Sequence, residues 1–138
     1  MGKLLIVGTM AFDAIETPFG KTGKILGGAG TFIGLAASQF KIDSAIVSVV
    51  GDDFPQSYMD ILKNKDIDLY SRDTLATELN TLADFNPIVP KDYTDADIVM
   101  LGNLHPNIQL SVINQMEKRP KLIVLDTMNF WMDNTWDE

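Results

Sequence analysis

The sequence predicts an α/β fold: a doubly wound, mostly parallel sheet with flanking helices. Three observations predict it. Short apolar runs, typical of strands buried on both faces, recur along the chain. Segments with helical spacing of apolar residues alternate with these runs. A chain of 138 residues with 46% hydrophobic residues is also long enough to bury one core.

Four apolar runs are predicted strands. Each is short, contains β-branched residues and ends at or beside a glycine or an aspartate, which is typical of buried parallel strands. These strands are residues 3–8, 44–50, 97–102 and 121–126.

Helical patterns follow the first three predicted strands. They cover residues 30–40, residues 54–64 and a segment that begins near Pro106, where the missing N–H of a first-turn proline does no harm. Strands and helices in this order predict a parallel sheet covered on both faces.

Two segments and the chain's end do not fit this alternation. Residues 14–26 are long for a strand-to-helix connection. Residues 70–86 show partial strand and partial helix spacing, so their state is left open. The sequence stops soon after the fourth predicted strand, with no helix to cover it, which would leave an exposed sheet edge. We therefore expect a partial domain.

Composition limits the classes of partner and compartment. With 11 basic and 19 acidic residues the formal net charge is -8, which disfavours nucleic acid and anionic membranes as partners. The absence of cysteine excludes disulfides and thiolate metal sites. The first apolar run is too short for a signal peptide, and no run approaches the roughly 18 apolar residues of a membrane span. We expect a cytoplasmic protein.

A glycine-rich stretch precedes the first predicted helix, in the sequence GGAGTFIG from Gly27 to Gly34. It loosely resembles a dinucleotide-binding fingerprint, but that motif must follow the first strand directly, and here about 20 residues intervene. The structural alternative is that Gly27 and Gly28 form a tight turn, while Gly30 and Gly34 let the helix approach the sheet.

Polar residues follow three of the predicted strands, where open α/β sheets bind ligands. Asp13 could accept hydrogen bonds from two neighbouring hydroxyls of a polyol, or could be a solvated turn residue. Asp126, with Asn129 three residues later, could bind a ligand or cap the next turn. Asn103 and His105 follow the third strand.

The single histidine limits the chemistry of the site. His105 has no partner histidine or cysteine for a metal site and no serine–aspartate pair for a catalytic triad. A hydrogen-bonded loop histidine close to a cleft is the favoured interpretation. We expect no metal ligand in this chain.

Four segments together resemble the N-terminal half of the PfkB-type, ribokinase-like carbohydrate and nucleoside kinases. They are VGTMAFD, GGAGTFIGLAAS, VVGDDF and LDTMN, in that order along the chain. The resemblance implies one ribokinase-like kinase domain whose N-terminal part spans residues 1–138. It also implies a small β lid over the sugar site, with lid segments near 14–26 and 70–86.

The resemblance implies ATP-dependent phosphorylation of a hydroxyl on a sugar or nucleoside, with Mg²⁺ as the metal cofactor. Asp13, Gly27 and Gly28 would contact the acceptor. The catalytic aspartate and the ATP site belong to the family's C-terminal half, and no matching glycine-rich segment occurs here. We therefore expect no catalytic residue in this chain, no turnover by it alone, and a possible homodimer through the lid.

Three departures from the family pattern qualify this assignment. Phe32 stands where the family usually has an asparagine, which points to a different or more apolar acceptor. The segment from Asp126 to Asn129 lacks the usual arginine, and Leu69 runs directly into Tyr70 without the expected lid strand. A non-catalytic polyol-binding module is the alternative function; a nicotinamide-dependent oxidoreductase ranks last, because the glycine fingerprint is missing after the first strand.

Overall fold

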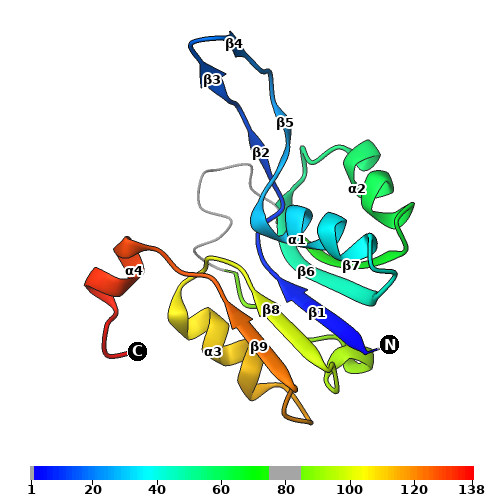
Figure 1. Cartoon of the computed structure of the whole chain (residues 1–138), viewed down its shortest axis with the longest axis vertical. Coiled ribbons are helices and arrows are strands. Elements are labelled where there is room, and N and C mark those ends of the chain that lie inside the picture. The colour runs from blue at the N-terminus through cyan, green and yellow to red at the C-terminus, as the bar shows by residue number, and fades with distance from the viewer. Residues whose placement is uncertain (1, 75–84) are drawn as a thin grey trace.

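The computed structural model describes residues 2–74 and 85–138 (Figure 1). Its core is a sheet with the strand order β7-β6-β1-β8-β9, in which every neighbouring pair is parallel. The strands are β1 (Lys3–Val7), β6 (Asp43–Gly51), β7 (Ile67–Thr74), β8 (Ile98–Leu101) and β9 (Leu122–Leu125).

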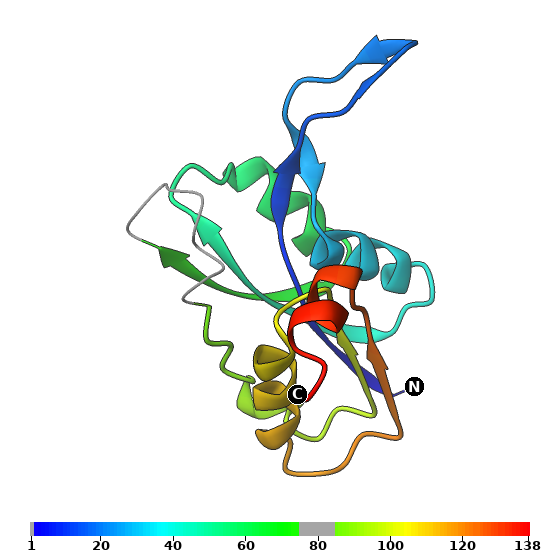
Figure 2. The same cartoon turned by 90° about the vertical axis from the view of Figure 1, so that its left-hand side faces the viewer.

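Helices pack on both faces of this sheet (Figures 1 and 2). Helices α1 (Ala29–Ser38) and α2 (Gln56–Lys63) cover one face. Helix α3 (Pro106–Asn114) and the 3-10 turn η1 (Lys91–Tyr93) cover the other. The predicted doubly wound α/β architecture is confirmed.

Strand β1 lies in the middle of the sheet and divides the core into two layers. Leu4 and Ile6 pack with residues of α1 and α2, whereas Leu5 and Val7 pack with the opposite layer. Alternate residues of a strand point to opposite faces, so a continuous apolar run fills both layers.

A long β-hairpin rises from the carboxyl end of β1 and projects away from the sheet (Figures 1 and 2). Its base is the antiparallel pair β2 (Ala11–Asp13) and β5 (Ile25–Gly27), and its outer part is the pair β3 (Glu16–Thr17) and β4 (Gly20–Lys21). Residues 14–26, which are long for a strand-to-helix connection, thus form most of an antiparallel ribbon.

The sequence did not decide between strand and helix for residues 70–86, and this segment begins as part of the main sheet. Residues 70–74 complete strand β7, and their backbone pairs in register with residues 47–51 of β6. Residues 75–84, which fall within the predicted second lid segment, lie outside the described residues. Phe85 and Val89 return to the core on the α3 side of the sheet.

The prediction that the fourth strand is buried on both faces is wrong. Strand β9 is the edge of the sheet, and the side chains of Leu122 and Leu125 are 52% and 54% exposed. A short helix that the sequence analysis missed, α4 (Asn129–Asn134), follows β9 but has no buried residue. An apolar run predicts burial, but it does not show whether a strand has neighbours on both sides.

No helix among the described residues is long and apolar enough to cross a membrane.

Candidate functional site

The carboxyl ends of β1 and β8 meet the start of α1 at three glycines. A Cβ atom placed on Gly8 would lie 3.0 Å from the backbone nitrogen of Gly30, and one on Gly102 would lie 3.2 Å from the Cα of Gly8. Such distances are tighter than most Cβ contacts, so a side chain at either glycine would push these backbones apart by a few tenths of an ångström. The predicted packing roles of Gly30 and Gly34 are confirmed, since a Cβ on Gly34 would press on the Ile46 side chain at 2.6 Å.

Thr9 caps the start of helix α1. Its side-chain Oγ1 accepts the N–H of Ala29 at 3.0 Å, and its carbonyl accepts the N–H of Gly30 at 2.8 Å. These first-turn N–H groups are the ones that a phosphate would need. The chain itself occupies them, so this glycine-rich turn is not built as an open phosphate cradle. Sequence analysis missed Thr9, although a threonine directly after a strand-ending glycine was a usable signal.

Asp13, Gly27 and Gly28 lie together at the base of the hairpin. Asp13 ends β2, Gly27 ends β5, and a Cβ on Gly27 would overlap the Asp13 carboxylate. Gly28 has a φ of 95°, and a Cβ there would collide with the Thr9 carbonyl. The half-buried carboxylate of Asp13 therefore rests on side-chain-free backbone at the carboxyl end of β1.

Phe32 lies in the first turn of α1, next to this group. Its N–H donates to the carbonyl of Gly28 at 3.2 Å, and its side chain is 56% exposed. Phe32 is thus an apolar side chain on the surface and is not part of the core.

The other predicted residues lie at the ends of β8 and β9. Gln109 of α3 joins these two strand ends, because its side-chain amide donates to the carbonyls of Gly102 at 2.9 Å and Asp126 at 2.8 Å. Gln109 is only 3% exposed. Sequence analysis missed it; a glutamine beside the apolar positions of the predicted helix was the available signal.

Asn103 and His105 hold local structure. The Asn103 Oδ1 accepts the indole N–H of Trp131 at 2.8 Å, and the His105 ring meets the Trp131 ring edge-on with centroids 5.1 Å apart. The His105 Nδ1 also accepts the N–H of Asn107 at 3.2 Å, which caps helix α3. His105 is thus a hydrogen-bonded loop histidine, as favoured from the sequence.

Asp126 and Asn129 are exposed. The capping role considered for Asp126 is not present, because Met128 is the N-cap of α4 and makes no side-chain capping bond. Asn129 is the first residue of α4. These two residues lie on the same edge of the sheet as Asn103 and His105, at the neighbouring strand.

The clearest electrostatic perturbations lie at the other end of the sheet. The Tyr93 hydroxyl contacts carboxylate oxygens of Asp43 at 2.6 Å and Asp68 at 3.1 Å. Burial, and then the hydrogen bond with Asp43, raise the pKa of Tyr93 far above its usual range. Asp43 starts β6, so this cluster is at the amino ends of the strands, away from the predicted site. Among residues 2–74 and 85–138, no group of three or more His, Cys, Asp or Glu side chains could hold a metal ion.

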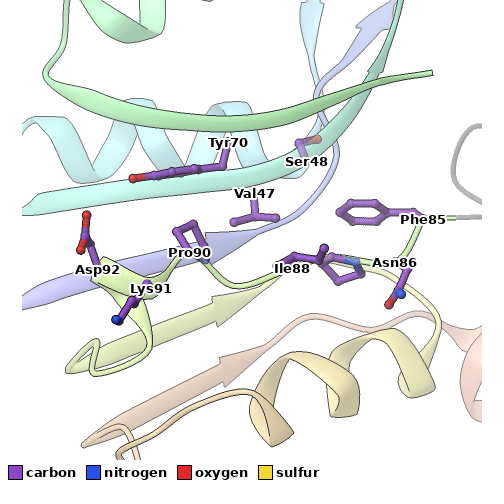
Figure 3. Close-up of a pocket in the computed structure, with 10 residues that line it drawn as sticks. Val47, Ser48, Tyr70, Phe85, Asn86, Ile88, Pro90, Lys91 and Asp92 are labelled. Carbon is purple, nitrogen blue, oxygen red and sulfur yellow. The ribbon is translucent and has the colours of Figure 1, made fainter. Parts of the chain in front are cut away.

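A separate pocket of about 400 Å³ opens on the α3 side of β6 and β7 (Figure 3). Val47 and Ser48 form its floor, Tyr70 and Phe85 contribute rings, and residues 86–88 and 90–92 supply the remaining wall. It contains none of the eight predicted site residues.

The comparisons with known proteins concern the fold. No family model and no curated protein matches the chain. The crystal structure of Sa239 is similar over 91% of this chain and 54% of its own, with a TM-score of 0.63 and 16% identity. The Escherichia coli phosphofructokinase-2 structure in complex with potassium matches over 96% of this chain and 56% of its own, with a TM-score of 0.53 and 10% identity. A structure described as a candidate ribokinase from Agrobacterium tumefaciens matches over 83% and 48%, with a TM-score of 0.50 and 15% identity.

These structures share an arrangement of strands and helices with this chain, at identities too low to transfer an activity. The chain spans about half the length of each of them (54%, 56% and 48%). It therefore has a ribokinase-like α/β fold and corresponds to about half of the fold in those proteins.

Proposed function

We propose that this chain supplies the acceptor-binding half of a PfkB-type sugar or nucleoside kinase. The observation that carries the proposal is the Asp13 carboxylate, which rests on Gly27 at the base of the hairpin and at the carboxyl end of the central strand β1. A carboxylate in that position can accept hydrogen bonds from two neighbouring hydroxyls. The absence of a Cβ on Gly27 and Gly28 lets an acceptor approach the backbone.

The reaction proposed is transfer of the γ-phosphoryl group of ATP, with Mg²⁺, to an acceptor hydroxyl. The catalytic base and the nucleotide site are assigned to sequence beyond these 138 residues. The capped start of α1 supports that division, because Thr9 occupies N–H groups that a phosphate would use. Asn103, His105, Asp126 and Asn129 would border the acceptor from the ends of β8 and β9.

The hairpin is proposed to act as a lid over the acceptor and as a surface for a homodimer. It projects from the sheet beside Asp13, and Phe19 near its tip is 99% exposed. A fully exposed phenylalanine on a β ribbon is a plausible contact for a second copy. The net charge of -8 fits a small-molecule substrate better than a polyanionic partner. A cytoplasmic site of action is part of the proposal.

The first test is binding of an acceptor by the 138-residue chain. We expect one or more members of a panel of sugars and nucleosides to raise the melting temperature, because a ligand that binds only the folded state stabilises it. Asp13→Asn should abolish the shift, since an amide oxygen and an amino group replace two acceptor oxygens. Asp133→Asn, on the exposed α4, is the matched control and should keep the shift.

A phosphorylation assay distinguishes the proposed kinase from the alternative, a non-catalytic polyol-binding module. The longer protein that contains this chain should phosphorylate the same compound that the chain binds, whereas the chain alone should not. Binding without phosphorylation by the longer protein would favour a polyol-binding module. Turnover by the 138-residue chain would show that the catalytic machinery has been assigned to the wrong part of the protein.

A further inference from the structure

The pocket in Figure 3 is a defined cavity away from the proposed acceptor site. Its volume of about 400 Å³ is within the range of small-molecule sites. Val47 on the floor and Phe85 at one end are 3% and 8% exposed, so these walls are packed in the core. Ile88 borders the opening and is 54% exposed. Such walls favour a flat apolar body.

The end of the pocket opposite Phe85 is polar. Figure 3 shows the Tyr70 hydroxyl and the Asp92 carboxylate at that end. Among the described side chains, those of residues 2–70 and 85–138, none hydrogen-bonds the Tyr70 hydroxyl and none forms an ion pair with the Asp92 carboxylate. Within that part of the chain, both groups face the pocket without a partner.

Among the side chains that the structure describes, negative charge dominates around this end. Burial raises the pKa of Tyr70, and the carboxylates of Asp68, Asp92 and Asp43 raise it further, so all three act on the ring that lines the pocket. The nearby cation Lys3 is paired with Asp95 at 2.9 Å, and its ammonium also donates to the backbone carbonyl of Asp92 at 2.8 Å, which leaves the Asp92 carboxylate itself unpaired among the described side chains. The ammonium of Lys91 is turned away from the cavity (Figure 3).

We propose that this pocket binds a small organic cation with a flat apolar body, such as an aromatic amine. The rings would lie between Val47, Phe85 and Ile88. The ammonium would lie at the Tyr70 and Asp92 end, where it gains a carboxylate and the face or hydroxyl of a tyrosine. The charge at this end opposes an anion of the same shape. This inference is independent of the proposed kinase function.

The test uses three probes of one shape: 2-naphthylmethylammonium, the neutral 2-naphthalenemethanol and the anion 2-naphthoate. Each is titrated into the 138-residue chain, with methyl NMR signals of Val47 and Ile88 reporting the location. We expect the cation to bind about threefold to thirtyfold more tightly than the alcohol, and the anion least tightly. The ratio of the affinity for the cation to that for the alcohol should fall as salt is added, because salt screens the interaction between exposed charges.

Two substitutions test whether the preference for the cation over the alcohol arises in this pocket. Asp92→Asn should reduce the affinity for the cation several-fold, toward that for the alcohol, and leave the affinity for the alcohol unchanged. Asp133→Asn on α4 removes the same charge elsewhere and should change neither. The melting temperature of each variant verifies that it is folded.

Four results would overturn the proposal. Three concern the unsubstituted chain: equal affinity for cation and alcohol, no binding of either at millimolar concentration, and signals that shift only on the exposed apolar residues of β9 and α4. The fourth is an unchanged preference for the cation in Asp92→Asn.

Discussion

Single residues decide the geometry at the base of the hairpin. Gly28 has to adopt a φ of 95° while its Cα faces the Thr9 carbonyl, and Gly27 has to leave space for the Asp13 carboxylate. The sequence showed a glycine pair, but it could not show which partner each glycine accommodates. The partners, Asp13 for Gly27 and Thr9 for Gly28, lie 14 and 19 residues earlier in the chain.

Gly28→Ala should destabilise the chain by about 1–3 kcal/mol, because it adds a side chain in a left-handed conformation and against a carbonyl. Urea denaturation measures the change in the free energy of unfolding. Gly23→Ala is the control: nothing lies within 4 Å of the added Cβ, and the free energy of unfolding should change little. Equal effects of the two substitutions would argue against this account of Gly28.

Asp97 gives the chain a pH-dependent contribution to stability. Its Oδ1 pairs with the Lys121 ammonium at 2.7 Å, and its Oδ2 accepts the N–H of Lys3 at 3.2 Å. The Lys121 hydrogen bond first, and then the Lys3 N–H, lower the pKa of Asp97 below its usual range. Because the pKa of Asp97 is lower in the folded chain than in the unfolded chain, the ionised carboxylate stabilises the fold. This stabilisation is fully present above the unfolded-state pKa and is lost as the pH falls through the folded-state pKa.

Asp97→Asn should therefore lower stability at neutral pH, and the difference from the unsubstituted chain should disappear well below about pH 4. Denaturation at a series of pH values measures this. Asp133→Asn, on an exposed helix, should show no such dependence. A difference that stayed constant from neutral to acid pH would show that the ionised carboxylate is not the cause.

At the scale of elements, an aromatic cluster fixes the hairpin to the body of the chain. Phe12 of β2 lies 5.3 Å from Phe54 and 5.9 Å from Tyr58 of α2, measured between ring centroids. The ammonium of Lys24 lies 5.4 Å from the centroid of the Phe12 ring. Aromatic contacts of this kind each contribute about 0.5–1.5 kcal/mol. The cluster therefore sets the direction in which the ribbon leaves the sheet.

Phe54→Ala should loosen the hairpin and speed trypsin cleavage after Lys21 and Lys24. Cleavage after Lys118, which is exposed on the connection between α3 and β9, is the internal reference and should not change. Tyr58→Phe is the matched control, because it removes only a hydroxyl whose contact with the Lys24 carbonyl is long, at 3.5 Å. General acceleration at all sites would indicate global unfolding instead.

At the scale of the whole molecule, the β9 side of the sheet stays open within the described residues. Exposed apolar side chains gather on β9, on α4 and at the residues around them. They are Leu122, Leu125, Met128, Phe130, Met132 and Trp136. An edge strand with apolar neighbours is a site for pairing with another chain.

The 138-residue chain should therefore self-associate in a concentration-dependent manner, and Leu125→Lys should reduce this several-fold in sedimentation velocity. Phe40→Lys, which alters an exposed phenylalanine after α1, is the control and should have little effect. Loss of association in Phe19→Ser but not in Leu125→Lys would assign the contact to the hairpin tip.

The sequence by itself determined the α/β class, the alternation of four core strands with three helices, and the polar residues that follow three of those strands. These are local properties, because apolar periodicity and turn residues depend on a few neighbouring positions. The exposed edge expected after the fourth strand is present at β9. The tertiary structure alone decided that Asp13 rests on Gly27 and that Thr9 caps α1. It also decided that a separate pocket forms between Tyr70 and Phe85. Each of these depends on residues far apart in sequence, whose approach is set by strand order and packing and is not visible in any short stretch of sequence.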